Sequence, residues 1–512
     1  MSDWGQGYPV DIPYTRGFYP ELAPAHLEAA LLFAGFNANL TRSGTRYCEL
    51  GCGYGLTTLI LAAANPQISF VGVDFNPSHI VAATALAESA GLRNVQFVEA
   101  SFDELLEPRF SDLGTFDIIA LHGIYSWVSP ALRRAIVDFA GAKLRTGGAL
   151  YVSYNAAPGW MPRAPLQRLL FESAKRNPAA DPRLATAEAF RFAKQMKDAG
   201  SAYFAANPGV GAYIETMEGK DLAYLVHEHL NESWSALYHA DVVADFSRTR
   251  LSYACSAHIS DDLDETSVPI QTHGLLPGTA DVVWRETVKD FLVSRSFRRD
   301  IFVRGPQPLS ATTRMEQLDR TYMLIVPRKD ATAKIGTALG IVEGRAAIYS
   351  EVFDLLAAGP SSLSRLLASA RGAAKDPVVL VQSLALLVHS GQVKMVRSAT
   401  DLDRAPARRL NVAFAREITA GKGFQTLAAP TIGTGVAGGL ADFGYLLARE
   451  RGLTLEPKTI AETIWQAIEG TSTRPRRGDE VLQQKADALN YLIQAAEHLL
   501  SEKVGILDAL GI

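Results

Sequence analysis

A glycine-rich segment near the start of the chain carries the clearest chemical signal. Its sequence, ELGCGYG, runs from Glu49 to Gly55, between a run typical of a strand and a run typical of a helix. Glycines let the backbone turn sharply and let a ligand lie against bare main chain, while the next helix presents free N–H groups. The segment therefore predicts a ligand-binding loop.

The glycine spacing distinguishes between two kinds of ligand. A dinucleotide fingerprint needs glycines at its first, third and sixth positions, but here the fifth position is glycine and the sixth is leucine. Gly51, Gly53 and Gly55, preceded by Glu49, favour a cofactor with a zwitterionic amino-acid tail and no pyrophosphate. Glu49 can face a positively charged amino or sulfonium group. Asp74, at the end of the next predicted strand, can accept hydrogen bonds from both ribose hydroxyls.

The segments around this loop predict the elements that must position it. Short β-rich runs alternate with helical runs, which is typical of a parallel sheet covered by helices. Five strands are expected, at 46–50, 69–74, 95–99, 116–121 and 149–154. Asn76, Pro77 and Gly91 supply the cap, the first turn and the stop of the helix after the second strand. Two further strands, at 251–259 and 299–304, are expected to join the same sheet after a helical insertion.

These features resemble the class I S-adenosylmethionine-dependent methyltransferases. Ser101 and Phe102, in VEASFDEL, fall where that family binds and covers adenine, and the run 116–128, FDIIALHGIYSWV, falls at its fourth strand, whose end lies beside the methyl group. The resemblance implies a Rossmann-like α/β fold with a seven-stranded sheet and S-adenosylmethionine as cofactor, with no metal. It assigns the cofactor contacts to Glu49, Gly51, Gly53, Gly55, Asp74, Phe75, Ser101, Phe102 and His122.

A narrower resemblance concerns four motifs. The runs LHGIYSWV at 121–128, YVSYNAAPGW at 151–160, YLVHEHLNESWSALYHADVV at 224–243 and LSYACSAHI at 251–259 look like bacterial methyltransferases with a methyltransferase regulatory domain. That group includes the rickettsial protein lysine methyltransferases, which modify outer-membrane protein. The resemblance covers about residues 13–304, and it implies a protein acceptor, with lysine amino groups methylated, and a homodimer built partly through a helical insertion.

The acceptor side of the site is expected to be aromatic. Methyl transfer to a lysine needs a dry, aligned site and a neutral amine, which desolvation and aromatic faces favour. The candidates lie before the sheet or after its fourth and fifth strands: Tyr14, Tyr19, His122, Tyr125, Trp127, Tyr154, Asn155 and Trp160. Tyr125 and Tyr154 are expected as aromatic walls, Asn155 as the group that orients the acceptor, and His122 as a cofactor contact or a base. Core packing of the aromatic residues and a purely structural His122 are the alternatives.

The aromatic segment at 8–24, with Tyr8, Tyr14, Phe18 and Tyr19, precedes the sheet. It can fold over the cofactor as a lid, or it can serve as a strap that only packs. Both readings stay open at the level of sequence.

The length predicts about three domains. The first is expected at 1–306 and contains the helical insertion at about 164–222. The second, at 307–400, is expected to be winged-helix-like, because helices at 348–358, 363–371 and 378–390 precede a short strand at 392–397. The third, at 401–512, is expected to be mostly helical, with loops at 429–439 and 470–478.

Composition excludes several classes of protein. The 512 residues contain 50 basic and 54 acidic side chains, for a formal charge of −4, and 48% are hydrophobic, so neither a disordered chain nor a broadly basic nucleic-acid binder fits. Cys48, Cys52 and Cys255 are too few for a disulfide framework. The first residues lack a secretion signal, and no apolar run approaches the ~18 residues that span a bilayer. A cytoplasmic protein is expected.

Other motifs are weaker. His227, Glu228, His229 and His239 suggest a metal cluster, but their spacing is not that of a zincin, so helix-surface or interdomain hydrogen bonds are favoured. The basic groups at 295–299 and 474–477 are expected to be solvated or to contact acidic partners. The fourth strand ends in His-Gly-Ile-Tyr and lacks an Asn/Asp-Pro-Pro-aromatic signature, which argues against base amino groups of nucleic acids as acceptors.

Two alternatives to a protein acceptor remain. The first is transfer to a small molecule or a saccharide. The second is a binding scaffold that has lost catalysis and whose winged-helix-like part binds DNA or a protein. The intact Glu49, glycine loop and Asp74 favour retained cofactor binding over the scaffold.

Overall fold

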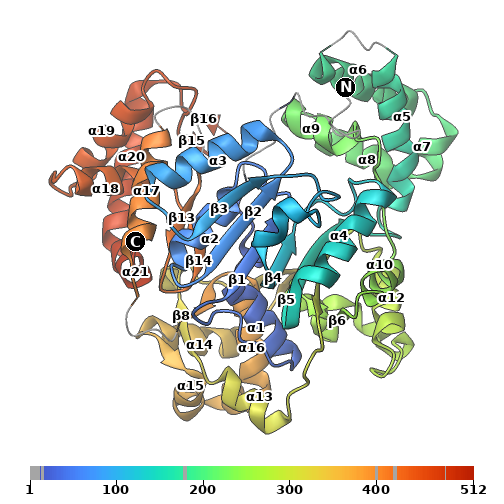
Figure 1. The fold of residues 1–512 in the computed structure, drawn as a ribbon. Coiled ribbons are helices and arrows are strands. Elements are labelled where there is room, and N and C mark those ends of the chain that lie inside the picture. The colour runs from blue at the N-terminus through green and yellow to red at the C-terminus, as the bar shows by residue number, and fades with distance from the viewer. Residues whose placement is uncertain (1–11, 13–16, 177–180, 398–401, 419–423, 479) are drawn as a thin grey trace.

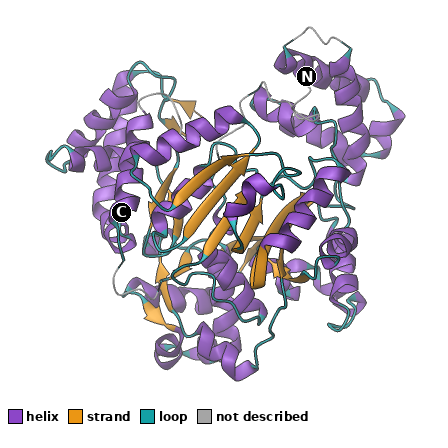
Figure 2. Cartoon of the chain, in the orientation of Figure 1, coloured by secondary structure: helices purple, strands orange, loops and turns teal. Residues whose placement is uncertain are grey.

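A seven-stranded sheet forms the centre of the molecule (Figures 1 and 2). The computed structural model describes residues 12, 17–176, 181–397, 402–418, 424–478 and 480–512. The strand order is β3-β2-β1-β4-β5-β7-β6. The strands are β1 Arg46–Leu50, β2 Ser69–Asp74, β3 Val95–Glu99, β4 Phe116–Leu121, β5 Leu144–Asn155, β6 Ser252–Ser256 and β7 Phe297–Val303. Strands β1 to β5 are parallel, and β7 runs antiparallel between β5 and β6. The predicted sheet is confirmed.

Helices cover both faces of this sheet (Figure 2). They are α1 Pro24–Ala34, α2 Leu56–Ala64, α3 Pro77–Ser89 and α4 Pro130–Lys143. Every residue of β4 and of α2 is buried, as expected for a central parallel strand and for a helix enclosed by other elements. The Asn76 side chain accepts a hydrogen bond from the Ser78 N–H and caps α3, and Pro77 begins the helix, as predicted.

The helical insertion projects from the carboxyl edge of β5 (Figure 1). It contains α5 Ala164–Lys175, α6 Pro182–Asp198, α7 Ala202–Ala206, α8 Pro208–Met217 and α9 Leu222–His229. It has a small core of its own, built from Leu166, Leu170, Ala189, Ala193, Phe204, Val210 and Ile214. The insertion predicted from sequence is therefore confirmed as a helical layer with independent packing.

The chain returns to the sheet through α10 His239–Ser247, α11 Asp264–Ser267 and α12 Val282–Val293. A buried ionic network joins these helices to β7. The Arg298 guanidinium lies 2.9 Å from Glu286, 2.6 Å from Asp290 and 3.0 Å from Asp300. Because a buried charge is costly unless it is paired, this network fixes β7 against α12.

Residues 307–400 form a smaller mixed layer. It contains α13 Ala311–Leu318, β8 Thr321–Leu324, β9 Lys334–Thr337, β10 Gly340–Glu343, α14 Ala346–Ala357, β11 Ser361–Ser362, α15 Leu363–Ser369, α16 Pro377–His389 and β12 Val393–Met395. Strands β11, β8 and β12 make a three-stranded sheet, and β9 and β10 make a hairpin. The expected order of three helices and a strand is present, and the winged-helix interpretation stays a prediction.

The last part of the chain is mostly helical, as expected. Its elements are α17 Ala405–Glu417, β13 Thr426–Ala429, β14 Thr434–Ala437, α18 Leu440–Glu450, α19 Pro457–Ile468, β15 Arg476–Arg477, β16 Glu480–Val481, α20 Lys485–His498 and α21 Val504–Leu510. The predicted loop at 429–439 was wrong, because it contains β14 and the end of β13. This hairpin packs against α2, and the Asn65 Nδ2 donates to the Gly433 carbonyl at 2.9 Å.

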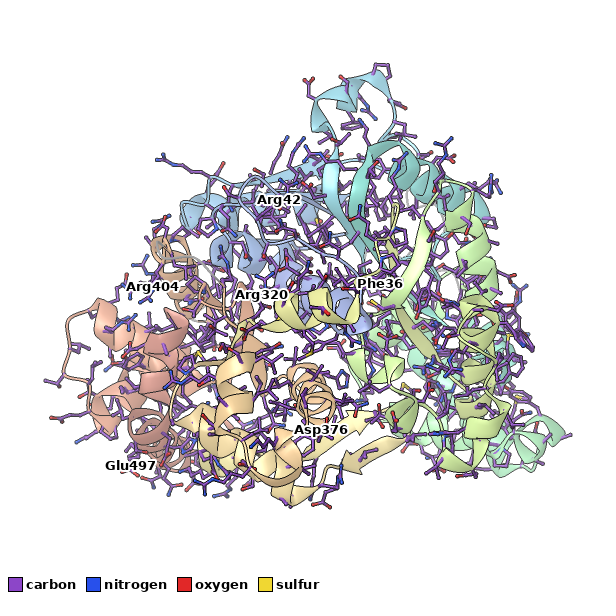
Figure 3. All side chains as sticks on the ribbon, turned by 90° about the horizontal axis from the view of Figure 1, so that it is seen from below. Phe36, Arg42, Arg320, Asp376, Arg404 and Glu497 are labelled. Carbon is purple, nitrogen blue, oxygen red and sulfur yellow. The ribbon has the colours of Figure 1, made fainter. Side chains whose placement is uncertain are left out.

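The predicted domains share buried contacts. One hydrophobic core runs from Leu22 in the first unit through the second unit to Ile512. Figure 3 shows Arg320, which precedes β8, on the face seen from below. Its guanidinium lies 3.6 Å from Glu28 of the first unit. The boundaries after 306 and 400 therefore stay predictions. Among the described residues, no helix is both long and apolar enough to cross a membrane.

Candidate active site

A pocket opens at the carboxyl edge of the sheet, beside the point between β1 and β4 where the strand order reverses. Open α/β sheets bind ligands at such a point. We call it the glycine-loop pocket. Apart from Gly55, all the residues predicted to contact the cofactor line it: Glu49, Gly51, Gly53, Asp74, Phe75, Ser101, Phe102 and His122. Their common position shows that separate strand ends contribute to one cavity.

The glycines shape this pocket through backbone geometry. Gly51 has φ +72°, and a Cβ at this position would lie 2.4 Å from Ile124 Cδ1. Gly53 has φ +53°, but a Cβ there would meet nothing within 4 Å, so its main chain borders open space. Gly55 occupies the N-cap of α2 with φ +69°. Glycine at 51 therefore permits close packing, whereas glycine at 53 leaves room for a ligand against the loop.

Glu49 supplies a buried carboxylate at the base of the loop. Only 5% of the residue is exposed, and one carboxylate oxygen accepts a hydrogen bond from the Thr58 hydroxyl at 2.5 Å. Burial raises the pKa of Glu49 to about 7, against the opposing effect of the Thr58 hydrogen bond, and the charge of Asp74 adds to the increase. A nearby cation would favour the ionised form of this group.

Asp74 ties the glycine loop to the end of β2. Its Oδ2 accepts a hydrogen bond from Gly53 N at 2.9 Å, and its Oδ1 accepts one from Asn76 N at 2.9 Å. The same Oδ1 lies 3.1 Å from His79 Nδ1. A carboxylate offers about four lone-pair sites. The protein groups therefore leave Asp74 capacity for about one further hydrogen bond, and its acceptance of two ribose hydroxyls stays a prediction.

His122 follows β4 and lines the other end of the pocket. Its Nδ1 lies 2.8 Å from the hydroxyl of Tyr151 on β5, and its ring stacks on Tyr19 at a centroid distance of 3.9 Å. Burial lowers the pKa of His122 to about 4; Glu21 opposes this change and Arg299 adds to it. The imidazole is therefore neutral at neutral pH and would be only a weak general base.

Part of the aromatic amino-terminal segment forms a wall of the pocket. Gly17 and Tyr19 line it, and Tyr19 N donates to the Thr57 hydroxyl at 3.3 Å. An ion pair of 2.8 Å between Glu21 and Arg299 of β7 holds the next residues in place. Tyr8 and the predicted site residue Tyr14 lie outside the described residues. Movement of this segment as a lid stays a prediction.

The structure does not place Tyr125 and Tyr154 in the pocket. Both rings are buried in the core on the face of the sheet opposite Tyr151. The Tyr125 hydroxyl donates to Asp245 at 2.9 Å, and the Tyr154 hydroxyl donates to Asp300 at 2.6 Å. These positions correct the expectation that the two rings wall the acceptor site. Side chains alternate along a strand, so Tyr151 faces His122 while Tyr154, three residues later, faces away.

Asn155 and Trp160 lie at the junction with the insertion, apart from the pocket lining. Asn155 is 5% exposed, and its backbone N–H donates to the Ser126 hydroxyl at 2.8 Å. The Trp160 ring packs edge-to-face against Trp234 at 5.4 Å and Tyr213 at 5.9 Å. Neither position tests an acceptor contact, so their predicted roles stay predictions.

Several pocket residues were not singled out from the sequence for cofactor binding. Tyr54, Thr57, Ile124, Val128 and Leu132 line the pocket, as does Trp127, which was expected on the acceptor side. Tyr54 and Thr57 flank the last glycine of the loop, so their closeness to that motif was a usable signal. Leu132 lies on α4, and only the packing of that helix brings it to the site.

The histidines of the weak metal motif have separate partners. His227 Nε2 lies 3.0 Å from the Ile12 carbonyl oxygen, His229 Nε2 lies 3.2 Å from the Tyr213 hydroxyl, and His239 Nδ1 lies 3.0 Å from Asp300. Within the described ranges, no group of three histidine, cysteine or acidic side chains could hold a metal ion.

Two family models match the chain. A methyltransferase domain matches residues 41–196, and a predicted methyltransferase regulatory domain matches residues 221–304. The first range contains β1 to β5 and most of the pocket, and the second contains α9 to β7. The matched ranges coincide with the two parts of the chain that carried the sequence resemblance.

Similar proteins extend this comparison to the whole chain. The uncharacterized protein sll1526 of Synechocystis is 33% identical over 99% of this chain and 99% of its own length. The uncharacterized protein RP789 of Rickettsia prowazekii is 25% identical over 62% of this chain and 57% of its own length. PKMT2 of Rickettsia typhi, solved in complex with AdoHcy, has a similar fold, with a TM-score of 0.69 and 19% identity, over 97% of this chain and 99% of that one.

Proposed function

The chain belongs to the S-adenosylmethionine-dependent methyltransferases that carry a methyltransferase regulatory domain, and from this premise we propose that it methylates lysine side chains of proteins. The cofactor is S-adenosylmethionine. The main support for the acceptor is the likeness in fold, over almost the full length, to PKMT2 of Rickettsia typhi. The motif resemblance to rickettsial protein lysine methyltransferases adds to it.

The residues of the glycine-loop pocket fit this cofactor. The carboxylate of Glu49 suits the ammonium group of its amino-acid tail, and the open main chain at Gly53 leaves room beside it. The Asp74 carboxylate can accept a hydrogen bond from a ribose hydroxyl, and the rings of Phe75 and Phe102 can pack against adenine. When bound, S-adenosylmethionine supplies a methyl group on a sulfonium centre, where an acceptor with a free electron pair can displace it in line.

The wall formed by Tyr19 and His122 would then lie beside the acceptor. Stacked rings exclude water, and a dry site lowers the pKa of an amine, so it favours the neutral form that can attack. The Tyr151 hydroxyl holds the imidazole of His122 in a fixed orientation. In this proposal, His122 and Tyr19 position the acceptor, and His122 does not need to carry a charge.

Incubation of the purified protein with cofactor labelled in the methyl group and a host lysate tests the class of acceptor. The proposal predicts that label enters the protein fraction. A Gly53→Arg variant is the matched control, because its side chain would fill the space that Gly53 leaves open. Label that enters only saccharides or small molecules would reject the protein acceptor and favour the alternative.

We also propose that the insertion mediates a homodimer. Leu184 and Phe192 on α6 are exposed by 62% and 48%, and their spacing of eight residues places them on one face of the helix. Replacing both with glutamate is expected to convert a dimer into a monomer in light scattering. A wild-type monomer at micromolar concentration, or a variant that stays dimeric, would contradict this assignment.

A further inference from the structure

A second cavity lies in the carboxy-terminal part of the chain. Its volume is about 450 Å³, within the range of sites that bind small molecules. The start of α18, the second half of α20 and the segment that leads into β15 line it. Figure 1 shows these elements on the left of the view, with the central sheet to their right. Among the described residues, this carboxy-terminal cavity shares no lining residue with the glycine-loop pocket.

The carboxy-terminal cavity is lined by three basic side chains that are charged at neutral pH: Arg474, Arg476 and Lys503. Arg474 Nη1 donates to two carbonyl oxygens of its own loop, both at 2.7 Å, and so holds that loop in place. The neighbouring Arg477 pairs with Glu480 at 2.8 Å. Arg476 and Lys503, by contrast, form no ion pair within the part of the chain that the structure describes. Two cations at this cavity therefore have no acidic partner there.

The remaining polar groups of the cavity do not cancel this charge. Of its lining residues in the described ranges, Asp442 alone is acidic, and its Oδ2 already accepts a hydrogen bond from Gly439 N at 2.7 Å. Leu440 and Ala441, in the first turn of α18, also line the cavity. The first N–H groups of a helix lack carbonyl partners within it and add partial positive charge. The cavity therefore has the electrostatic character of an anion site.

Much of the remaining lining is apolar. Phe424, Phe443, Leu492 and Leu499 line the cavity, and each is at most 3% exposed. Tyr491 lines it as well and is half-buried. A bare inorganic ion would leave this apolar surface in contact with water. An anion that carries an apolar or aromatic body would cover it and gain from the burial.

We propose that the carboxy-terminal cavity binds a small organic phosphate. Its phosphate group would lie at Arg476 and Lys503, because charged donors form strong hydrogen bonds with phosphate oxygens. Its organic body would lie against the buried aromatic and leucine side chains. Lys503 ends a π-helical turn at Leu499–Lys503, and such turns are frequent at functional sites. The inference does not depend on which acceptor the enzyme methylates.

Calorimetric titration of the intact chain with phenyl phosphate tests the site. The protein is first saturated with AdoHcy, so that the glycine-loop pocket is occupied. We expect phenyl phosphate to bind at one site per chain. Phenol lacks the charge and inorganic phosphate lacks the ring, so each is expected to bind at least about 10-fold more weakly.

Two variants on separate elements test the cations. Arg476→Gln and Lys503→Gln are each expected to weaken phenyl phosphate binding by about 10- to 100-fold, as for loss of a charge-assisted hydrogen bond. Arg477→Gln is the matched control, because it removes the same charge from the same hairpin but from a side chain that pairs with Glu480. It is expected to leave the affinity unchanged. Circular dichroism verifies folding, and if one cavity variant does not fold, the other decides.

Several results would overturn the inference. Absence of phenyl phosphate binding to the wild-type protein would remove the site. Equally tight binding of phenol would remove the anion, and equally tight binding of inorganic phosphate would remove the organic body. Equal weakening by Arg477→Gln and the cavity variants would reduce the effect to net charge. A phosphotyrosine peptide that binds more tightly than phenyl phosphate would assign the cavity to a protein ligand instead of a small molecule.

Discussion

Replacement of Glu49 with glutamine should remove a pH dependence from cofactor binding. The carboxylate is buried at the base of the glycine loop, and its pKa is raised to about 7. A ligand whose ammonium group binds only the ionised carboxylate binds more weakly when a smaller fraction of Glu49 is ionised. The apparent Kd is therefore the intrinsic Kd divided by the ionised fraction, so affinity should rise with pH below 7.

The magnitude follows from the titration. With a pKa of about 7, Glu49 is about 3% ionised at pH 5.5 and about 50% ionised at pH 7.0. The affinity for AdoHcy should therefore increase by about 15-fold over this range, or about 1.6 kcal/mol. The interval lies below the ordinary pKa of an α-amino group, so the ligand keeps its charge. His122, with a pKa lowered to about 4, contributes little here.

The same substitution should stabilise the ligand-free protein. The pKa of Glu49 rises from 4.5 to about 7 on folding. Its favourable contribution is thus complete below pH 4.5 and is lost as the pH rises to 7, a loss of about 3 kcal/mol. A glutamine stays neutral and can still accept the Thr58 hydrogen bond. We therefore expect Glu49→Gln to unfold at higher urea concentration than the wild type at pH 8.

Calorimetric titration with AdoHcy at several pH values, paired with urea unfolding, measures both effects. Thr58→Val is a useful companion, because it removes the partner of Glu49 and keeps the carboxylate. The reasoning is refuted if wild-type affinity is flat between pH 5.5 and 7.0. It is also refuted if Glu49→Gln binds AdoHcy with the same pH slope as the wild type, since other titrating groups are common to both proteins.

Three further predictions concern the glycine loop, the buried network and the pocket wall. Gly53→Arg should abolish AdoHcy binding in calorimetry while circular dichroism stays native, because the added side chain extends into open space; tight binding would contradict the pocket assignment. Asp300→Asn should cost about 3–5 kcal/mol in urea unfolding, because it leaves buried Arg298 with one fewer counter-charge; a loss below about 1 kcal/mol would be inconsistent. Tyr151→Phe should lower kcat by about 2- to 10-fold through the lost bond to His122, with AdoHcy affinity unchanged; an unchanged kcat would remove His122 orientation from the account.

Much of the central fold could be predicted from sequence because its signals are local. The first four expected strands have the same bounds as β1 to β4. Their apolar runs are short and end at glycine or polar residues, so burial and strand ends coincide in the sequence. β5 instead begins at Leu144, five residues earlier than expected, because RTGG after its first residue reads as a turn.

The hairpin of β13 and β14 depends on tertiary packing, so the sequence alone did not predict it. The hairpin of β13 and β14 contains small residues and Pro430, which read as a loop. It is a hairpin because it covers the apolar surface of α2. A segment whose pairing depends on a helix some 360 residues earlier has no local signal of its own.

The site shows the same division between local and distant information. The cofactor loop could be predicted because ELGCGYG is contiguous and its glycine backbone shapes the binding loop. The choice between Tyr151 and Tyr154 could not, because it depends on strand register. Ala120 pairs with Tyr151, and His122, two residues later, shares that face of the sheet.

The most direct test of the central claim is identification of the methylated product. Protein labelled with methyl-tritiated S-adenosylmethionine is hydrolysed to amino acids, and the label is separated by chromatography against methylated standards. We predict that the label elutes with Nε-methyllysine and is absent when the Gly53→Arg variant replaces the wild type. Label that elutes with another methylated amino acid, or no label in protein despite tight AdoHcy binding, would contradict the assignment of this chain as a protein lysine methyltransferase.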